Sequence, residues 1–177
     1  MQVELSVSVG VAMYPQDGTA MASLLHRAEL ALHQAKAEGT ARIGFFSLAL
    51  SRVAEERIAL EKALREALQG GGLQLYYQPQ VELASGRLHG LEALACWEHP
   101  TLGFIPPTRF IPLAEECGLM GGLSRWALDQ ACRQLALWRR EGLTVPVVAV
   151  NLSASNFQSP ELPAIVAQTL ERHGLQA

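Results

Sequence analysis

The chain has 177 residues, 49% of them hydrophobic and 18% charged, and a formal net charge of −3. This composition is typical of a folded globular protein and excludes a largely disordered chain. The slightly negative charge gives no electrostatic basis for binding a nucleic-acid polymer, so an anionic ligand would need a local site such as a metal ion. No apolar stretch is long enough to span a bilayer, and we expect no membrane contact from this segment.

The cysteines point to a reducing environment. Cys96, Cys117 and Cys132 are odd in number and show no CxxC spacing. This pattern argues against a disulfide framework or a zinc site and favours a cytoplasmic location. The parent protein could still be anchored in a membrane through domains upstream of this segment.

The first part of the chain reads as strand, helix and strand. Gln2 to Met13 alternates between apolar and small or polar residues, which predicts a half-buried strand. A helix should follow and end at Gly39, and Ile43 to Phe46 could form one more short strand. A piece of this size is too small to bury a core alone, so it resembles the end of a larger domain. The apolar stripe of the helix is Met21, Leu24, Leu25, Ala28, Leu32 and Ala35.

A charged helix is predicted from Ser47 to Gln69, with Glu and Arg interleaved along it. Its apolar seam is narrow and consists of Ile58, Leu64 and Leu68. Three consecutive glycines, beginning at Gly70, end the helix and mark a domain boundary. We interpret this helix as a connector between two domains.

Two strands joined by a short turn are predicted between Leu73 and Pro100. The second strand carries a lone acidic residue, Glu92, in an otherwise apolar run. Because side chains alternate along a strand, Glu92 shares a face with Leu94 and Cys96. A carboxylate on a buried strand face needs a partner, since burying an unpaired charge is costly, and a metal ion would be one such partner.

Helices and strands alternate in the remainder. A loop rich in proline and glycine spans residues 100–107, and helices are predicted over Phe110–Cys117 and Leu123–Glu141. A strand from Val145 to Asn151 precedes a last helix over Pro160–His173. This alternation predicts an α/β domain with a parallel sheet.

Five strings in this part, in the same order and spacing, resemble the EAL family of cyclic-di-GMP phosphodiesterases. They are YYQPQ, LEALACWEHP, FIPLAEECGL, RWALDQACRQLALW and VAVNLSASNF. The family's fold is a modified (β/α)8 barrel, so the predicted fold class is α/β with a partial barrel of the EAL type. A whole barrel takes roughly 250 residues. We therefore expect less than half a barrel here, and a fragment that is inactive alone.

The N-terminal strings SVGVAMYPQDG and LLHRAELALHQAKAEG resemble the C-terminal segment of GGDEF domains, the diguanylate cyclases. Lys36 and Gly39 match that family, whereas Glu29 and His33 replace its usual Asp and Tyr. The signature loop of the family would lie upstream of Met1. The predicted parts are a GGDEF remnant over 1–46, a connecting helix and glycine linker over 47–71, and the N-terminal part of an EAL domain over 72–177.

The EAL resemblance assigns roles to four residues. Glu92 and Asn151 match ligands of the catalytic divalent metal, for which Mg2+ or Mn2+ is expected because these cations favour carboxylate and amide oxygens. Gln78 and Leu94 match residues that contact the substrate, cyclic-di-GMP, which is hydrolysed to pGpG. Without the resemblance, Glu92 would be interpreted as a salt-bridged or edge residue of a strand and Asn151 as a turn or cap residue. The remaining catalytic groups are expected beyond Ala177.

Cys96 departs from the family pattern, which usually has Arg at this place to pair with a ligand phosphate. A thiol cannot replace a bidentate cationic donor. An alternative is therefore a degenerate EAL domain that acts as a cyclic-di-GMP receptor or a protein-interaction module without catalysis. A third reading is a fragment without a function of its own. A homodimer formed through the EAL part is also possible on this resemblance.

Overall fold

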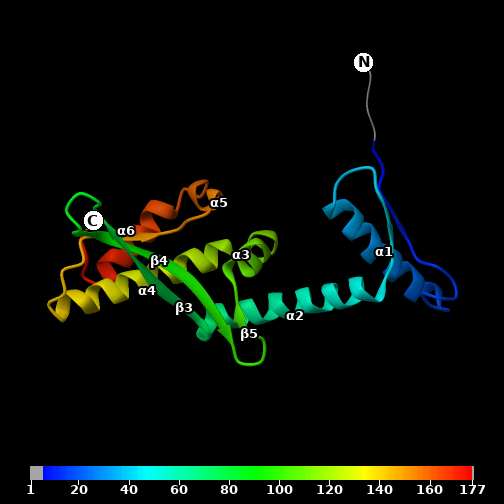
Figure 1. Cartoon of the computed structure of the whole chain (residues 1–177), viewed down its shortest axis with the longest axis horizontal. Coiled ribbons are helices and arrows are strands. Elements are labelled where there is room, and N and C mark those ends of the chain that lie inside the picture. Colours follow the sequence, from blue (N-terminus) through cyan, green and yellow to red (C-terminus); the bar gives the residue numbers. More distant parts are fainter. Residues whose placement is uncertain (1–5, 177) are drawn as a thin grey trace, which may run out of the picture. The chain divides into compact units, whose positions relative to one another are not determined.

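A computed structural model describes residues 6–176, and Figure 1 labels the helices and strands. These residues fall into two units that divide between Leu60 and Glu61. The first unit has a two-stranded sheet and the second a four-stranded sheet. Helix α2 (Leu48–Gly70) contributes residues to both units. Within the described residues, no helix combines the length and the apolar character needed to cross a bilayer.

The first unit is built from two short parallel strands and the helix that connects them. Strand β1 covers Val9–Val11, helix α1 covers Met21–Ala37, and strand β2 covers Ile43–Phe45. The predictions for this helix and for the strand after it are confirmed. Two members of the predicted apolar stripe lie outside the packed face, since Met21 is 73% exposed and Leu25 is 58% exposed.

Helix α1 lies directly against the two strands because a glycine faces it from each strand. A Cβ atom on Gly10 would lie 2.0 Å from the carbonyl oxygen of Ala28, and one on Gly44 would lie 2.4 Å from that of Ala31. Any larger residue at either position would force the helix away from the strands. The close approach leaves Ala31 and Ala35 almost fully buried.

The strand predicted over Gln2–Met13 is wrong in length. β1 covers only Val9–Val11, residues 6–8 are not strand, and residues 2–5 of the prediction lie outside the described residues. Among the described residues the partner of β1 is β2, which has three residues. A longer alternating pattern cannot form a ladder where no partner strand faces it.

The second unit centres on a long antiparallel hairpin. Strand β3 (Leu73–Val81) pairs with strand β4 (Leu88–His99), as predicted from the two-strand pattern. β4 also pairs antiparallel with β5 (Gly103–Ile105) and parallel with β6 (Val148–Val150). The predicted parallel pairing is confirmed for β4 and β6 only, and the described sheet as a whole is mixed. Short connections on both sides of β4 require antiparallel neighbours, and only β6 follows a helical crossover.

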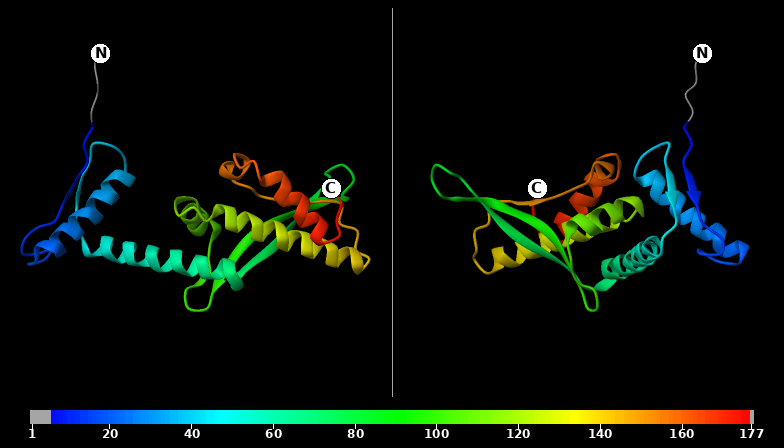
Figure 2. Two further views of the ribbon diagram at one scale, coloured as in Figure 1. Left: turned by 180° about the vertical axis from the view of Figure 1, so that it is seen from behind. Right: turned by 45° about the vertical axis from the view of Figure 1, so that its right-hand side comes forward.

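The helices of the second unit agree with the sequence pattern, with two additions. Helix α3 starts a few residues before the predicted position because Pro107 occupies the first turn, where the missing N–H costs nothing. The sequence did not predict β5 or the single-turn helix α5. Figures 1 and 2 show these elements. The helices are α3 (Pro107–Glu116), α4 (Met120–Arg140), α5 (Ala154–Phe157) and α6 (Leu162–Arg172).

The core of the second unit lies between β4 and the helices α3 and α4. Leu91, Ala93 and Trp97 are buried and share one face of β4, as the alternation predicted. The rings of Trp97 and Phe110, both 0% exposed, meet edge to face with centroids 5.8 Å apart. On the neighbouring strand Tyr77 packs on Trp138 of α4, with centroids 4.8 Å apart. One face of the hairpin is thus committed to packing.

Candidate metal and ligand site

The other face of the β3–β4 hairpin carries the polar side chains. Gln78 and Glu92 are opposite each other in the antiparallel register, and Tyr76 and Leu94 form the next pair along this face. Gln78 and Tyr76 are exposed, whereas Glu92 and Leu94 are half-buried. Directly opposite residues in antiparallel strands have Cβ atoms about 4.5–5.5 Å apart. The pairing therefore places Gln78, Glu92 and Leu94 on one continuous surface.

Strand β6 brings Asn151 to Glu92. Glu92 is in parallel register with Ala149, and Asn151 follows directly after the strand. The Asn151 side chain donates a hydrogen bond from Nδ2 to Oε1 of Glu92 at 2.9 Å. The sheet thus joins a carboxylate and an amide that are 59 residues apart in the sequence.

The segment after β6 is held against α4 by Asn156. Its Oδ1 atom accepts hydrogen bonds from Ser124 Oγ at 2.8 Å and from both the backbone N–H and the hydroxyl of Ser153, at 3.0 and 2.8 Å. Ser124 is only 5% exposed, and this bond satisfies its hydroxyl. The sequence reading missed this anchor. The spacing of Ser153 and Asn156, which resembles a capping box at the start of α5, was the available signal.

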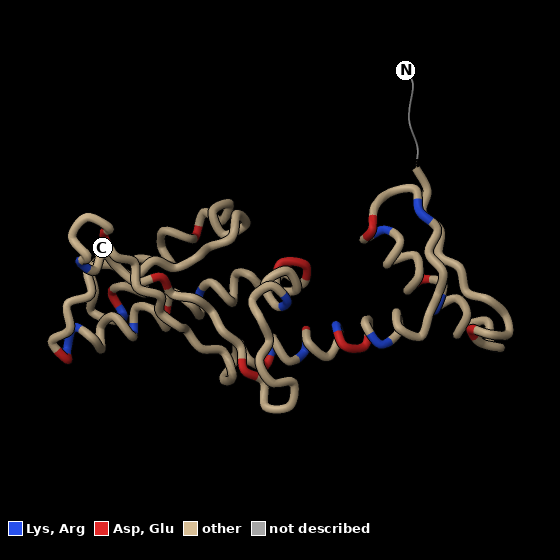
Figure 3. The backbone as a smooth tube through the Cα atoms, viewed as in Figure 1, with Lys and Arg blue, Asp and Glu red and all other residues tan. Residues whose placement is uncertain are grey.

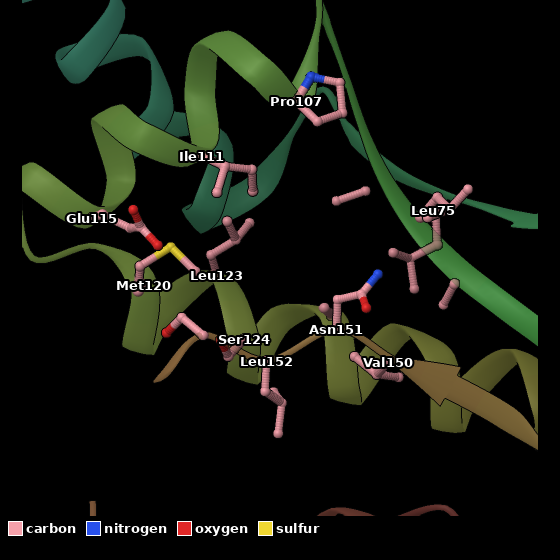
Figure 4. A pocket seen from close by; sticks show the side chains of 15 residues that line it. Leu75, Pro107, Ile111, Glu115, Met120, Leu123, Ser124, Val150, Asn151 and Leu152 are labelled. Carbon is pink, nitrogen blue, oxygen red and sulfur yellow. The ribbon is translucent and has the colours of Figure 1, made fainter. Parts of the chain in front are cut away.

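A cavity of about 260 Å³ lies next to this segment, between β4 and the start of α4. Figure 4 shows Asn151 on its wall beside Val150, with Ile111 of α3 and Leu123 of α4 on other parts of the wall. Of the four predicted site residues, Asn151 and Leu94 line this cavity. It is mainly apolar, and Ala93 from the packed face of β4 also lines it, so it lies on the helix side of the sheet and not on the face that carries Gln78 and Glu92.

The side-chain oxygens at this site are suited chemically to binding a hard divalent cation. Glu92 accepts no other hydrogen bond from the described residues, and none of them donates to Oδ1 of Asn151. Carboxylate and amide oxygens are ligands that Mg2+ and Mn2+ favour. The described residues contain no group of three or more His, Cys, Asp or Glu side chains able to hold a metal ion. Residues 6–176 therefore supply two donors, and water or substrate oxygens would complete the coordination.

Cys96 lies on the same face, two residues beyond Leu94, and pairs in register with Gln74. Its thiol is free and half-buried. Neither side chain of this pair is cationic. The position where the EAL pattern expects Arg therefore offers no positive charge to a phosphate in this chain.

Comparison with known proteins identifies a family for most of the chain. A family model described as "EAL domain" matches residues 61–177. Among solved structures, the chain is 45% identical to the Pseudomonas aeruginosa "PaMucR Phosphodiesterase, c-di-GMP complex", with a TM-score of 0.62 over 66% of this chain and 47% of that one. The Xanthomonas citri FimX EAL domain in complex with c-diGMP is 31% identical, with a TM-score of 0.61 over 70% of this chain and 48% of that one.

Curated relatives match over nearly the whole chain. The chain is 41% identical over 175 residues to the "Bifunctional diguanylate cyclase/cyclic di-GMP phosphodiesterase MucR" of Pseudomonas aeruginosa. This match covers 99% of the chain and 26% of that protein. It is 44% identical over 173 residues to the "Cyclic di-GMP phosphodiesterase NbdA" of the same species, covering 98% and 22%. The "Oxygen sensor protein DosP" of Escherichia coli is 40% identical over 171 residues, covering 97% and 21%. The chain thus spans about a quarter of the length of these relatives.

Proposed function

The chain belongs to the EAL domain family, and on that premise we propose that it forms part of a metal-dependent phosphodiesterase that hydrolyses cyclic-di-GMP to pGpG. The observation that carries this proposal is the 2.9 Å hydrogen bond between Asn151 and Glu92. Two relatives named as cyclic di-GMP phosphodiesterases, each more than 40% identical, support it. Because the chain spans about a quarter of those proteins, the activity is proposed for a longer protein that contains it.

In this proposal Glu92 and Asn151 hold one divalent cation, Mg2+ or Mn2+. When bound, the cation supplies Lewis acidity and lowers the pKa of a water molecule that attacks phosphorus. Glu92 contributes the negative charge that attracts the cation, and Asn151 contributes a neutral oxygen. The mutual hydrogen bond fixes both side chains before any ligand arrives, which reduces the ordering cost of binding.

The substrate contacts are assigned to Gln78 and Leu94. Gln78 is exposed and directly opposite Glu92, so its amide can donate to a phosphate or ribose oxygen next to the cation. Leu94 lies two residues beyond Glu92 on the same face of β4, where its side chain can contact the flat face of a nucleobase. Polar contacts at the phosphate and apolar contacts at the base suit a cyclic dinucleotide.

We further propose the domain arrangement that the sequence suggests. Residues 1–46 are the end of a GGDEF domain, residues 47–71 a connecting helix and linker, and residues 72–177 the start of an EAL barrel. The match to MucR supports this, since it extends over 99% of the chain and that protein is named as a diguanylate cyclase as well. A homodimer through the EAL part and a cytoplasmic location complete the proposal. Light scattering of the purified protein tests for the homodimer, and fractionation of cells tests the cytoplasmic location.

A second function, a cyclic-di-GMP receptor without turnover, is favoured by one observation. Cys96 offers no cationic donor on the site face where the family usually has Arg. Binding through the remaining polar and apolar contacts would then persist while the phosphate is held less firmly. The two functions differ in turnover and not in the ligand.

The decisive experiment uses the longer protein and two glutamate variants. Glu92→Ala should abolish cyclic-di-GMP turnover in Mg2+ or Mn2+ and weaken Mn2+ binding by more than about 100-fold, since even groups behind metal ligands contribute 10–100-fold. Glu82→Ala is the matched control, because Glu82 is exposed and its carboxylate bonds to Ser85 in the hairpin loop. The control should retain both turnover and Mn2+ affinity.

Each outcome has a distinct meaning. Equal Mn2+ affinity of Glu92→Ala and the parent protein would contradict the metal site. Tight cyclic-di-GMP binding in Ca2+ without turnover in Mg2+ or Mn2+ would replace the phosphodiesterase by the receptor. The isolated chain should show no turnover, because it supplies only two oxygen donors from its described residues.

A further inference from the structure

A second cavity, of about 510 Å³, lies at the C-terminal ends of α4 and α6. Arg133, Arg139 and Arg140 approach it from α4, and Arg172 and His173 approach it from the end of α6. Figure 3 shows basic residues at this end of α4. Its lining residues come from α4, before β6 in the chain, and from the end of α6, after it, and they include neither Glu92 nor Asn151.

The positive charge in this cavity exceeds the negative charge. Asp129, one turn before Arg133, is bonded to Arg172 at 3.0 Å and to His173 at 2.9 Å. Arg133 donates only to the neutral side chain of Gln130, at 2.8 and 3.2 Å.

Two further arginines are free of partners. The side chains of Arg139 and Arg140 make no hydrogen bond or ion pair with any described residue. Glu141, next to Arg140 in the sequence, and Glu171, next to Arg172, are exposed and do not line the cavity. Among the described residues, therefore, three guanidinium groups at this cavity have no counter-charge.

Helix capping explains only part of this arrangement. Basic residues in the last turn of a helix are stabilised by its dipole, which accounts for Arg139, Arg140 and Arg172. Arg133 lies about two turns before the end of α4, where that effect has faded. Like charges that converge on one hollow repel each other unless an anion lies between them. Leu175, 8% exposed, gives the cavity an apolar wall that would exclude water from one side of a ligand.

We propose that this cavity binds a soluble, phosphate-bearing anion with at least two negative charges. The planar guanidinium group matches two phosphate oxygens at once, and several such groups can surround one phosphate or diphosphate. The cavity volume falls within the range of small-molecule sites. This site is separate from the Glu92–Asn151 pair and does not depend on the function proposed there.

The test is a titration of the chain with pyrophosphate at low and high salt. The parent chain should bind with a saturable 1:1 isotherm that weakens as salt rises. The double variant Arg139→Gln with Arg140→Gln should bind at least about tenfold more weakly, because each lost bond involves charged groups. Both residues are exposed, so the circular dichroism spectrum and the Tm should be unchanged.

Arg125→Gln is the matched control. It removes an arginine charge from the same helix, but Arg125 does not line the cavity and forms only a 3.9 Å pair with Glu161. Equal pyrophosphate affinity in the control and the double variant would overturn the proposal, as would the absence of saturable binding. Two other outcomes without pyrophosphate binding would also overturn it. One is binding to phosphatidylcholine vesicles only when they contain phosphatidylserine, and the other is binding to polyglutamate.

Discussion

The two faces of β4 have different tasks although they alternate residue by residue. The face that carries Leu91, Ala93 and Trp97 is buried against α3 and α4. The opposite face carries Glu92, which is half-buried and hydrogen-bonded to Asn151. The first face stabilises the unit, and the second is left free for chemistry.

This difference shows how one strand can serve both purposes. A side-chain period of two places every second residue on the opposite surface, so a site residue and a core residue can be adjacent in the chain. Packing on one face then fixes the backbone from which the site side chains project. Substitutions on the first face should change stability, and substitutions on the second should change ligand binding.

The largest effect is expected for Trp97→Ala, which empties the centre of the packed face. Removing a fully buried aromatic ring costs about 3–5 kcal/mol of unfolding free energy. Trp97→Phe should cost less, because the indole N–H has no hydrogen-bond partner among the described residues. Urea unfolding measures both. Tyr76→Ala is the control from the other face, where the side chain is 58% exposed, and a comparable loss there would break the comparison.

Cys96→Arg should strengthen ligand binding on the site face of β4. An arginine at this place would project from the same face as Glu92 and Leu94 and restore a cationic donor. We expect cyclic-di-GMP binding in the longer protein to tighten by about 1.5–3 kcal/mol. A titration in Ca2+ measures this without hydrolysis. Equal affinities would mean that this position does not face a phosphate.

Gly90→Ala tests whether the two faces are fully separate, because Gly90 is on the site face and yet buried. A Cβ atom there would lie 2.5 Å from Cγ1 and 2.9 Å from the carbonyl oxygen of Val147. That carbonyl also accepts the hydrogen bond from Leu91. We expect a loss of roughly 1–3 kcal/mol in urea unfolding. Gly121→Ala, with nothing within 4 Å of its added methyl group, is the control and should not lose stability.

The smallest expected effect on stability is that of Asp129, which lies in α4, in the helix layer behind the packed face. Burial alone would raise its pKa, but hydrogen bonds from His173 and Arg172 outweigh burial and hold the pKa below its usual value of 3.8. A lowered carboxyl pKa contributes stability above that usual value, and the contribution is lost as the pH falls through the folded pKa.

Asp129→Asn should therefore lower Tm at neutral pH by a shift equivalent to about 1 kcal/mol or less, since Arg172 is mostly exposed. The difference between parent and variant should shrink below pH 3.8. Thermal unfolding at several pH values measures this. A difference that stays constant down to the lowest pH would assign the effect to packing and not to charge.

Much of this protein follows from local pattern. Period-two alternation predicted the β3–β4 hairpin and the division of β4 into two faces. Apolar spacing predicted α1 and α4, and glycine stops predicted the ends of α1 and α2, because amphipathic faces and helix ends depend on residues only a few positions apart. The resemblance drew attention to Glu92, Asn151, Gln78 and Leu94, whose roles remain proposals.

Other features required the tertiary structure. The mixed sheet arises because neighbours of β4 are set by the lengths of the connections and not by the strand pattern. The Asn156 anchor and the arginine cavity combine residues from different elements, so no local window contains them. The sequence by itself determined which residues can form strands, helices and donors. Only the packing of those elements decided which side chains meet, because contacts between distant residues depend on the register and approach of whole elements.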